Sequence, residues 1–270
     1  MRSTEHYSKY KAVEHKYFTL YAAPVILKKL LSDDVYNHFM LYTVSCRLLS
    51  QQDRNIHIEK ARKYLRTFVE KAIVLYGPTF ISLNIHNLLH ICDDVESTGS
   101  SLSELSAFRF ESYLGGISNV IRSPNHIVKQ YCNRIEEQEK FVKKNITIHP
   151  ELQILKRKKS DILKIKYKGM AISLKHPNNT VLLSDKSVVE VCQFDCTVDD
   201  QISAKVKKYL RKESLFNYPC TSNTLNFEVS RLSNITTTIN LNGIQQKLVK
   251  MQLNFSSEED CRTVVVPLLH

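Results

Sequence analysis

The sequence predicts an α+β protein in which a helical N-terminal part precedes a small antiparallel β domain. Apolar residues recur at intervals of three and four through the first 150 residues, which is the period of an α-helix. After about residue 160, apolar and polar residues alternate and β-branched residues become frequent, which is typical of strands. We therefore divide the chain into a helical domain (1–150), a basic linker (151–160) and a β domain (161–270), for which an SH3-like barrel is our expectation.

Capping and helix-breaking residues place the helices. Pro24 suits the first turn of a short helix, and Ser32 with the two aspartates after it suits the N-terminus of a longer one. Gly77 and Pro78 should end the third helix. The expected helices cover residues 25–31, 35–49, 55–76, 84–95, 107–121 and 125–144.

Period-two alternation and turn residues place the strands. Pro177-Asn178-Asn179 forms a turn between two of them, because these residue types favour turn conformations. The expected strands cover residues 162–169, 170–176, 180–185, 187–194, 227–233, 235–242, 247–255 and 262–269. Together they predict a small antiparallel sheet or barrel.

The composition excludes several classes of protein. With 6 glycines in 270 residues, the chain contains neither a GxGxxG nor a GxxxxGK phosphate-binding loop. It has no long apolar run and begins with a polar segment, so we expect an intracellular protein without a membrane partner. The 7 cysteines lack the spacing of a disulfide framework, and we expect reduced thiols, mostly buried.

Positive charge favours a polyanionic partner such as DNA. Lysine and arginine (38) outnumber aspartate and glutamate (27), which gives a net charge of +11. The excess is divided between the two halves of the chain, so it identifies no single tail.

Two groups of basic residues lie at the start of the β part. Lys156, Arg157, Lys158 and Lys159 form a tetrad that suits a nuclear-import signal or phosphate contacts, although a solvated linker explains it equally well. Lys164, Lys166 and Lys168 alternate along one expected strand, so they should present a single basic face.

The helical part contains candidate metal ligands. His86 and His90 are four residues apart, which on one helix puts both imidazoles on the same face, a spacing suited to two ligands of a zinc ion. Two ligands do not close such a site, and the sequence has no CxxC pair; the alternative is two helix-packing or hydrogen-bonded histidines. Asp93 and Asp94 should lie late in the same helix, where negative charge opposes the helix dipole.

A single carboxylate stands out in the next expected helix. Glu111 lies between Phe110 and Tyr113. It either faces solvent at the edge of the helix or points into a cleft, where it could hold a divalent cation. The residues alone leave both interpretations open.

Four segments follow one another in a specific order: YAAPVILKKLLSDDVYNHFMLYTVSCRLL (21–49), LYGPTFISLNIHNLLHICDDVESTGS (75–100), SAFRFESYLGGISNVIR (106–122) and VVVPLLH (264–270). Together they resemble the C-terminal part of animal CACTA-type (En/Spm-like) transposases. These are related more distantly to the Transib transposases and to the recombination-activating recombinase of vertebrates. The resemblance extends over essentially the whole chain.

The resemblance implies roles for three residues. In the wider clade, a histidine pair on a helix helps to bind zinc, and a glutamate some twenty residues later completes the carboxylate triad of an RNase H-like nuclease. By this resemblance His86 and His90 match the zinc-binding pair, and Glu111 matches the third catalytic carboxylate. The helical domain would then be a remnant of an RNase H-like catalytic region, with ancestral sites for Zn²⁺ at the histidines and for Mg²⁺ at Glu111.

One glutamate cannot support two-metal phosphoryl transfer, which needs several carboxylates around two Mg²⁺ ions. The upstream aspartates should lie on strands, but Asp33, Asp34 and Asp53 occur in helical contexts. We therefore interpret the chain as a transposon-derived, nuclear, C-terminal fragment of a DDE/D-type transposase without activity of its own. Its candidate partners are DNA and the missing N-terminal transposase region or a full-length homologue.

Two other functions fit the same residues. The basic β domain could serve as a DNA- or protein-binding module without any catalysis. Alternatively, the chain could be a subunit that completes a metal site with another polypeptide, since His86, His90 and Glu111 lack partners in the sequence.

Overall fold

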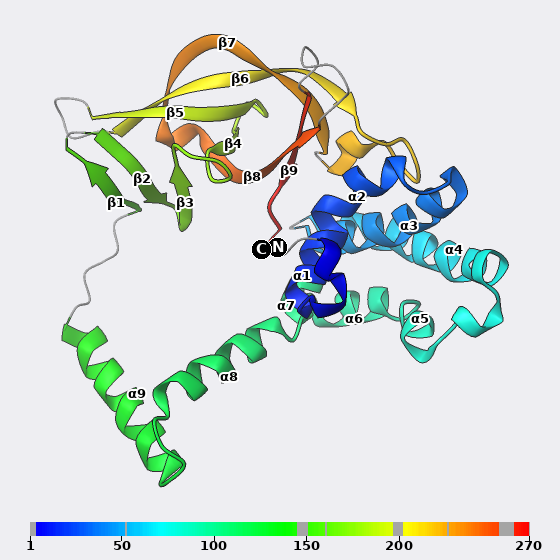
Figure 1. The fold of residues 1–270 in the computed structure, drawn as a ribbon, viewed down its shortest axis with the longest axis horizontal. Helices are drawn as coiled ribbons and strands as arrows, with labels where there is room; N and C mark the ends of the chain where they lie inside the picture. Colours follow the sequence, from blue (N-terminus) through cyan, green and yellow to red (C-terminus); the bar gives the residue numbers. More distant parts are fainter. Residues whose placement is uncertain are drawn as a thin grey trace.

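The computed structural model confirms the α+β class, with helices in the first half and strands in the second (Figure 1). The helices gather at one side of the barrel-like sheet, and one helical hairpin extends away from both (Figure 1). The structure describes residues 4–51, 53–144, 151–159, 161–196, 202–225, 227–253 and 262–269. Within them, no helix is long and apolar enough to cross a membrane.

The helices begin and end largely where capping residues predict. Ser32 precedes α3, Asp33 and Asp34 lie in its first turn, and Gly77, with a positive φ of 85°, ends α4. The α-helices are α1 (Ala12–Tyr17), α2 (Ala23–Ile26), α3 (Asp33–Leu49), α4 (Ile58–Tyr76), α5 (Leu83–Asn87), α6 (Ile91–Thr98), α7 (Leu102–Leu105), α8 (Phe108–Val120) and α9 (Ile127–Lys144). Short 3-10 or π segments cover Thr4–Lys9, Phe18–Ala22, Leu27–Lys29, Arg54–His57, Pro78–Phe80, Ser222–Leu225 and Leu241–Gly243.

The single helix expected over residues 84–95 is wrong, because the chain forms two helices there. Ser82 caps α5, and its hydroxyl accepts a hydrogen bond from the backbone N–H of Ile85 at 3.5 Å. A new helix, α6, begins at Ile91. Asp93 and Asp94 therefore lie in a first turn, where the helix dipole favours negative charge, rather than in a last turn.

Nine strands of the described chain form one antiparallel sheet, and part of it closes into a barrel. The strands are β1 (Leu152–Lys158), β2 (Asp161–Tyr167), β3 (Met170–Ser173), β4 (Thr180–Leu183), β5 (Val188–Cys196), β6 (Ile202–Ser214), β7 (Glu228–Asn240), β8 (Ile244–Leu253) and β9 (Arg262–Pro267). The ring runs β5-β4-β8-β9-β7-β6 and returns to β5 through the β5–β6 pairing. Strands β1, β2 and β3 extend the sheet beyond β5, to which β2 pairs.

Two strands lie where the sequence did not predict them. Residues 152–158, which we interpreted as part of a linker, form β1, and its backbone pairs with β2. Strand β6 covers Ile202–Ser214, where frequent lysines obscure the alternation of buried residues. The expected domain boundary at 145–160 includes residues 145–150 and 160, which lie outside the described residues.

One hydrophobic core joins the helices to the barrel. It contains Met40, Val44 and Leu48 of α3 together with Val264 and Val266 of β9. The closing segment of the chain thus packs against the helical half, and Figure 1 shows β9 running toward these helices. The two halves therefore share apolar contacts that stabilise both.

A buried arginine lies at this junction. The Arg47 guanidinium donates hydrogen bonds to the carbonyl oxygens of Leu20 at 3.1 Å and Pro267 at 3.3 Å. It also stacks over Tyr21 and Phe227, with 5.3 and 4.7 Å to the ring centroids. Burial lowers the pKa of Arg47 to about 10. The side chain stays cationic at neutral pH and ties α3 to both halves.

In contrast to this buried junction, the hairpin of α8 and α9 is exposed. No described side chain of α8 or α9 is buried, and Phe110, Tyr113 and Leu114 are 61–71% exposed. The hydroxyls of Tyr113 and Tyr131 lie 2.6 Å apart and link the two helices. Gly115 does not break α8, and a side chain added there would meet open space.

The cysteine expectation needs correction. Cys92 is buried and Cys46 and Cys220 are partly buried, but Cys132, Cys192 and Cys196 are exposed. Cys192 lies at an irregularity in the pairing of β5 with β6, Cys196 ends β5, and Cys132 is on the exposed α9. Cys261 lies outside the described residues.

Candidate metal and nucleic-acid sites

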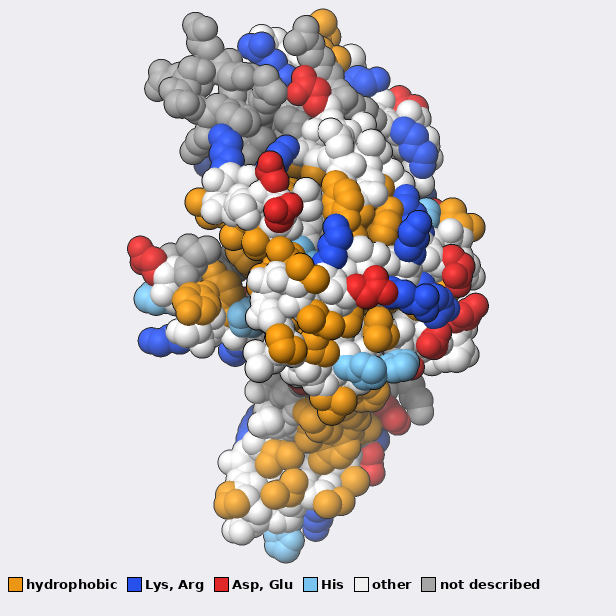
Figure 2. All heavy atoms as spheres, turned by 90° about the vertical axis from the view of Figure 1, so that its right-hand side faces the viewer, with side chains coloured by type: hydrophobic (Ala, Val, Ile, Leu, Met, Phe, Trp, Pro, Cys, Tyr) orange, Lys and Arg blue, Asp and Glu red, His pale blue; other side chains and the backbone are white. Residues whose placement is uncertain are grey.

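The predicted histidine pair comes together, although not on one helix. His86 lies in α5 and His90 immediately precedes α6, yet their ring centroids are 5.4 Å apart. Both side chains are exposed, and histidines adjoin each other on the face shown in Figure 2. The pair therefore does not form part of the helix packing, which was our alternative interpretation.

The described residues around the pair do not complete a zinc site. Among the described ion pairs, the carboxylate oxygen that approaches either ring is Oδ2 of Asp93, 4.0 Å from Nδ1 of His90. The other oxygen of Asp93 accepts a hydrogen bond from Arg62, which also binds Glu59 at 3.1 Å and Glu96 at 3.0 Å. Zinc needs about four close ligands, and no group of three or more His, Cys, Asp or Glu side chains in the described chain could hold a metal ion.

Arg62 forms the ion pairs that hold the acidic side chains of this surface. Its bonds to Asp93 and Glu59 raise its pKa above the ordinary value. A hollow of about 470 Å³ lies beside it, lined in part by Arg66, Glu70 and His90. Ion pairing with Arg62 therefore accounts for Asp93 without a metal.

Glu111 is exposed in the first turn of α8. It belongs to no group of acidic or histidine side chains in the described chain. A two-metal centre needs several carboxylates at one place, and the described residues supply only this one at α8. The residues present therefore do not fit a pair of Mg²⁺ ions.

The basic residues of the β domain are brought together by strand pairing. Lys156 of β1 lies directly opposite Lys164 of β2, and Gln153 lies opposite Lys166. Ile165 and Tyr167 alternate with these lysines and are buried, so Lys164 and Lys166 share the opposite face of β2.

The last lysine of the predicted row leaves the strand. Lys168 follows β2 in a turn with a φ of 46°, and its ammonium lies over the ring of Tyr167 at 5.2 Å from the centroid. The single basic face therefore includes Lys164 and Lys166 but not Lys168. The chain reverses there, since Tyr167 of β2 pairs with Met170 of the antiparallel strand β3.

The remaining residues of the tetrad are exposed at the tip of the hairpin. Arg157 and Lys158 end β1, and Lys159 has a φ of 55° in the turn toward β2. We use the name basic hairpin for Lys156, Arg157, Lys158, Lys159, Lys164 and Lys166. None of these side chains forms an ion pair with another described residue.

One basic residue of this surface was not predicted. Lys247 of β8 is half-buried, and its ammonium donates a hydrogen bond to Oδ1 of Asn178 in the loop between β3 and β4. Burial, and then the charge of Lys164, lower the pKa of Lys247. Only the strand order brings Lys247 near Lys164, so no spacing in the sequence signals it.

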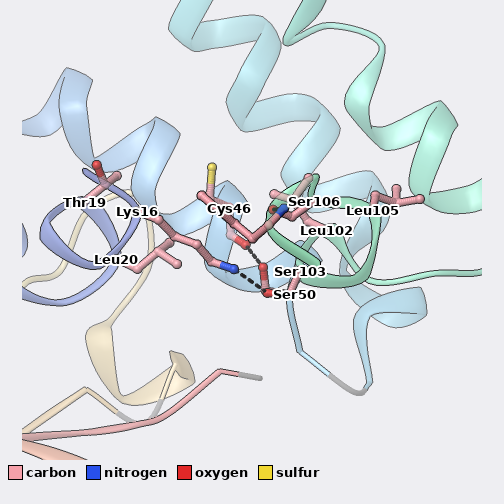
Figure 3. A pocket seen from close by; sticks show the side chains of 10 residues that line it. Lys16, Thr19, Leu20, Cys46, Ser50, Leu102, Ser103, Leu105 and Ser106 are labelled. Atoms are coloured by element: carbon pink, nitrogen blue, oxygen red, sulfur yellow. Dashed lines mark hydrogen bonds between the residues drawn. The ribbon is translucent and has the colours of Figure 1, made fainter. Parts of the chain in front are cut away.

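A separate apolar pocket lies in the helical half. Its volume is about 300 Å³, and Leu20, Leu102 and Phe108 contribute to its walls (Figure 3). Lys16 reaches across it toward Ser103, with 3.5 Å between Nζ and Oγ.

A thiol also lines this pocket. Burial raises the pKa of Cys46 to about 12, so the thiol is protonated at neutral pH. A protonated thiol is a poor nucleophile.

Comparison with known proteins adds one match. Residues 143–268, which include the end of α9 and nearly all of the β domain, match a family described as a domain of unknown function (DUF8592). No curated protein and no solved structure matches the chain.

Proposed function

We propose that this chain is a transposon-derived, nuclear protein that binds DNA through its β domain and does not cut it. The helical half is, on this proposal, the end of an RNase H-like catalytic region of a CACTA-type transposase. The finer assignment of the barrel as SH3-like belongs to the same proposal. Its basis is the resemblance of the four segments quoted above, together with the arrangement of charge.

The observation that carries the DNA-binding proposal is the unneutralised basic hairpin. Lys156 and Lys164 are directly opposite on paired strands, and like charges at such positions destabilise a sheet. No ion pair with a described residue offsets that repulsion. DNA phosphates would offset it, and each contact would release condensed counterions.

The proposal that the protein does not cut DNA rests on the surroundings of Glu111. Its carboxylate is exposed in α8 and belongs to no group of three or more His, Cys, Asp or Glu side chains of the described chain that could hold a metal ion. In-line phosphoryl transfer with two metals requires carboxylates that bridge or flank the ions. Glu111 alone does not provide that set.

Salt dependence of DNA binding tests the proposal. Fluorescence anisotropy with a random duplex of about 20 base pairs should give a dissociation constant that rises steeply with NaCl. If the hairpin contacts about four phosphates, log K should fall with log salt at a slope of roughly −3.6. A flat salt dependence, or no binding at low salt, would contradict the proposal.

One observation favours a second candidate, a subunit that completes a metal site with another polypeptide. His86 and His90 are exposed with rings 5.4 Å apart, so a partner could add the remaining ligands. The test mixes this protein with a polypeptide that supplies the upstream transposase region and measures Mg²⁺- or Mn²⁺-dependent nicking. No nicking, or nicking that Glu111→Gln leaves unchanged, rules this candidate out.

A further inference from the structure

Two lysines of strand β8, Lys250 and Lys247, have partners of different charge. Lys250 forms an ion pair with Glu190 at 2.9 Å. Glu190 also accepts hydrogen bonds from Tyr209 at 2.8 Å and Asn179 at 3.0 Å. The charge of Lys250 is therefore neutralised by a well-bonded carboxylate.

Lys247, three residues earlier on the same strand, has no such partner. Its ammonium donates to the neutral amide oxygen of Asn178, and no described carboxylate forms an ion pair with it. Asn178 is fixed by its backbone, since its N–H donates to Lys175 at 3.0 Å and its carbonyl accepts from Ser173 at 2.8 Å. A half-buried ammonium with only one neutral acceptor is costly, because burial removes hydration that the amide oxygen replaces only in part.

Neighbouring strands add further positive charge at the same place. Lys164 lies opposite Ser173 in the β2–β3 pairing and opposite Lys156 in the β1–β2 pairing. The charge of Lys164 also helps to lower the pKa of Lys247, so the two ammonium groups interact. The backbone N–H of Ser173, the residue opposite Lys164, donates to the carbonyl of Asn178, whose side chain accepts from Lys247.

We propose that Lys156, Lys164 and Lys247, with Asn178, form a binding site for one phosphate group. Three ammonium groups act as mobile hydrogen-bond donors and point charges, which suits a tetrahedral phosphate. The Asn178 oxygen holds Lys247 in place. This inference deepens the proposed DNA binding, because it names the part of the hairpin surface that receives a backbone phosphodiester. A free phosphate ion has the same chemistry, and the two sources are separated below.

The test uses the full chain labelled with ¹³C in its lysine side chains. Resonances of the ε-methylene groups of Lys164 and Lys247 are assigned with Lys164→Gln and Lys247→Gln. Inorganic phosphate, titrated against chloride at constant ionic strength, should shift both resonances saturably. Lys247→Gln should weaken phosphate binding at least tenfold, and Lys156→Gln should weaken it too. The control Lys63→Gln removes an exposed charge from α4 and should change nothing.

The second arm adds a DNA duplex and measures its affinity by anisotropy. DNA should shift the same two resonances, and Lys247→Gln should make the salt slope shallower by about one unit. If Lys247→Gln does not fold, Lys164→Gln and the wild-type titrations carry the same test. If neither phosphate nor DNA shifts the two resonances, the inference is overturned.

Failure of the inference and failure of the proposed function are distinguishable. DNA binding with a steep salt slope but without a shift at Lys164 and Lys247 overturns the phosphate site and leaves DNA binding intact. Saturable shifts with inorganic phosphate, but no measurable DNA binding, support the site and overturn the proposed function.

Discussion

The helical half and the β domain differ in what they do with their charged and ionisable residues. In the helical half, Arg62 pairs with three carboxylates, and Glu111 lies alone on an exposed helix. In the β domain, strand pairing places Lys156 and Lys164 directly opposite each other without an ion-pair partner among the described residues. The β domain therefore has more unpaired positive charge that an external anion could neutralise. The resemblance to a catalytic region, by contrast, concerns mainly the helices.

The largest expected effect tests whether the two regions are structurally independent. Phe227 is fully buried in the shared core and lies under Arg47, with 4.7 Å from the guanidinium carbon to the ring centroid. Phe227→Ala should lower the free energy of unfolding by about 3–5 kcal/mol, because it leaves a cavity in a close-packed core. Urea denaturation followed by circular dichroism measures the change.

The control for this variant is Ile235→Ala on β7, where the side chain is 72% exposed and the cost should stay within about 0.5 kcal/mol. Helical and strand signals should be lost in one transition in both variants. If Phe227→Ala unfolded the barrel and left the helices folded, the two regions would be independent domains.

The next prediction compares lysines of the basic hairpin with lysines of α4. Lys164→Gln with Lys166→Gln should weaken DNA binding roughly 60-fold at 0.1 M salt, if each lysine contacts one phosphate and contributes about 0.9 to the slope. Anisotropy titrations measure the change. The matched pair Lys60→Gln with Lys63→Gln removes the same charge from α4 and should cost less than about threefold, as a long-range effect only. Equal losses in both pairs would show that net charge, and not the hairpin, governs binding.

A third effect concerns His38, a buried ionisable residue of the helical half. Nε2–H of His38 donates to the Phe68 carbonyl at 2.8 Å, and the Tyr76 hydroxyl lies 3.2 Å from Nδ1. Desolvation by burial is the largest cause that lowers the pKa of His38 below its ordinary value of about 6.5. The unfolded chain therefore binds this proton more readily than the folded chain, so stability is complete above about pH 6.5 and falls as the pH decreases below it.

The slope from this one group has an upper limit of about 1.4 kcal/mol per pH unit in that window. Urea denaturation between pH 5 and 8 measures it, and His38→Gln should remove this contribution. Comparison of the two proteins at pH 8 provides the control, because His38 is neutral there and any difference in stability reflects packing alone. A wild-type profile without any decrease below pH 6.5 would contradict the assignment.

The smallest effect is expected at Glu111. Its side chain is exposed and makes no described hydrogen bond or ion pair, so Glu111→Gln should change the unfolding free energy by less than about 0.5 kcal/mol. DNA affinity should also stay within about twofold. Thermal unfolding and anisotropy check both, and a large gain in stability would reveal repulsion from a carboxylate near α8.

Local sequence signals predicted most helices correctly, because their ends depend on nearby capping residues. Ser32 and Gly77 act within one turn of the helices that they limit. The break between His86 and His90 was missed because no side-chain cap marks the start of α6 after His90, although the two rings still lie close together.

The phosphate site could not be predicted from the sequence for a different reason. Lys164 and Lys247 are far apart in the sequence and come near each other only because β3, which pairs with β2, lies beside β8 in the fold. Alternation indicates which face a residue occupies, but it does not determine strand order. The composition of the tetrad indicates a basic segment, but part of the tetrad is a strand only because it pairs with β2.

Lysine footprinting tests the central claim most directly, because it compares both regions in one experiment. The full chain is acetylated briefly with and without a DNA duplex at low salt, and modified lysines are quantified by mass spectrometry. The account predicts protection of Lys156, Lys164, Lys166 and Lys247, with Lys60 and Lys63 of α4 unchanged. Protection of the α4 lysines with a fully reactive hairpin would contradict it.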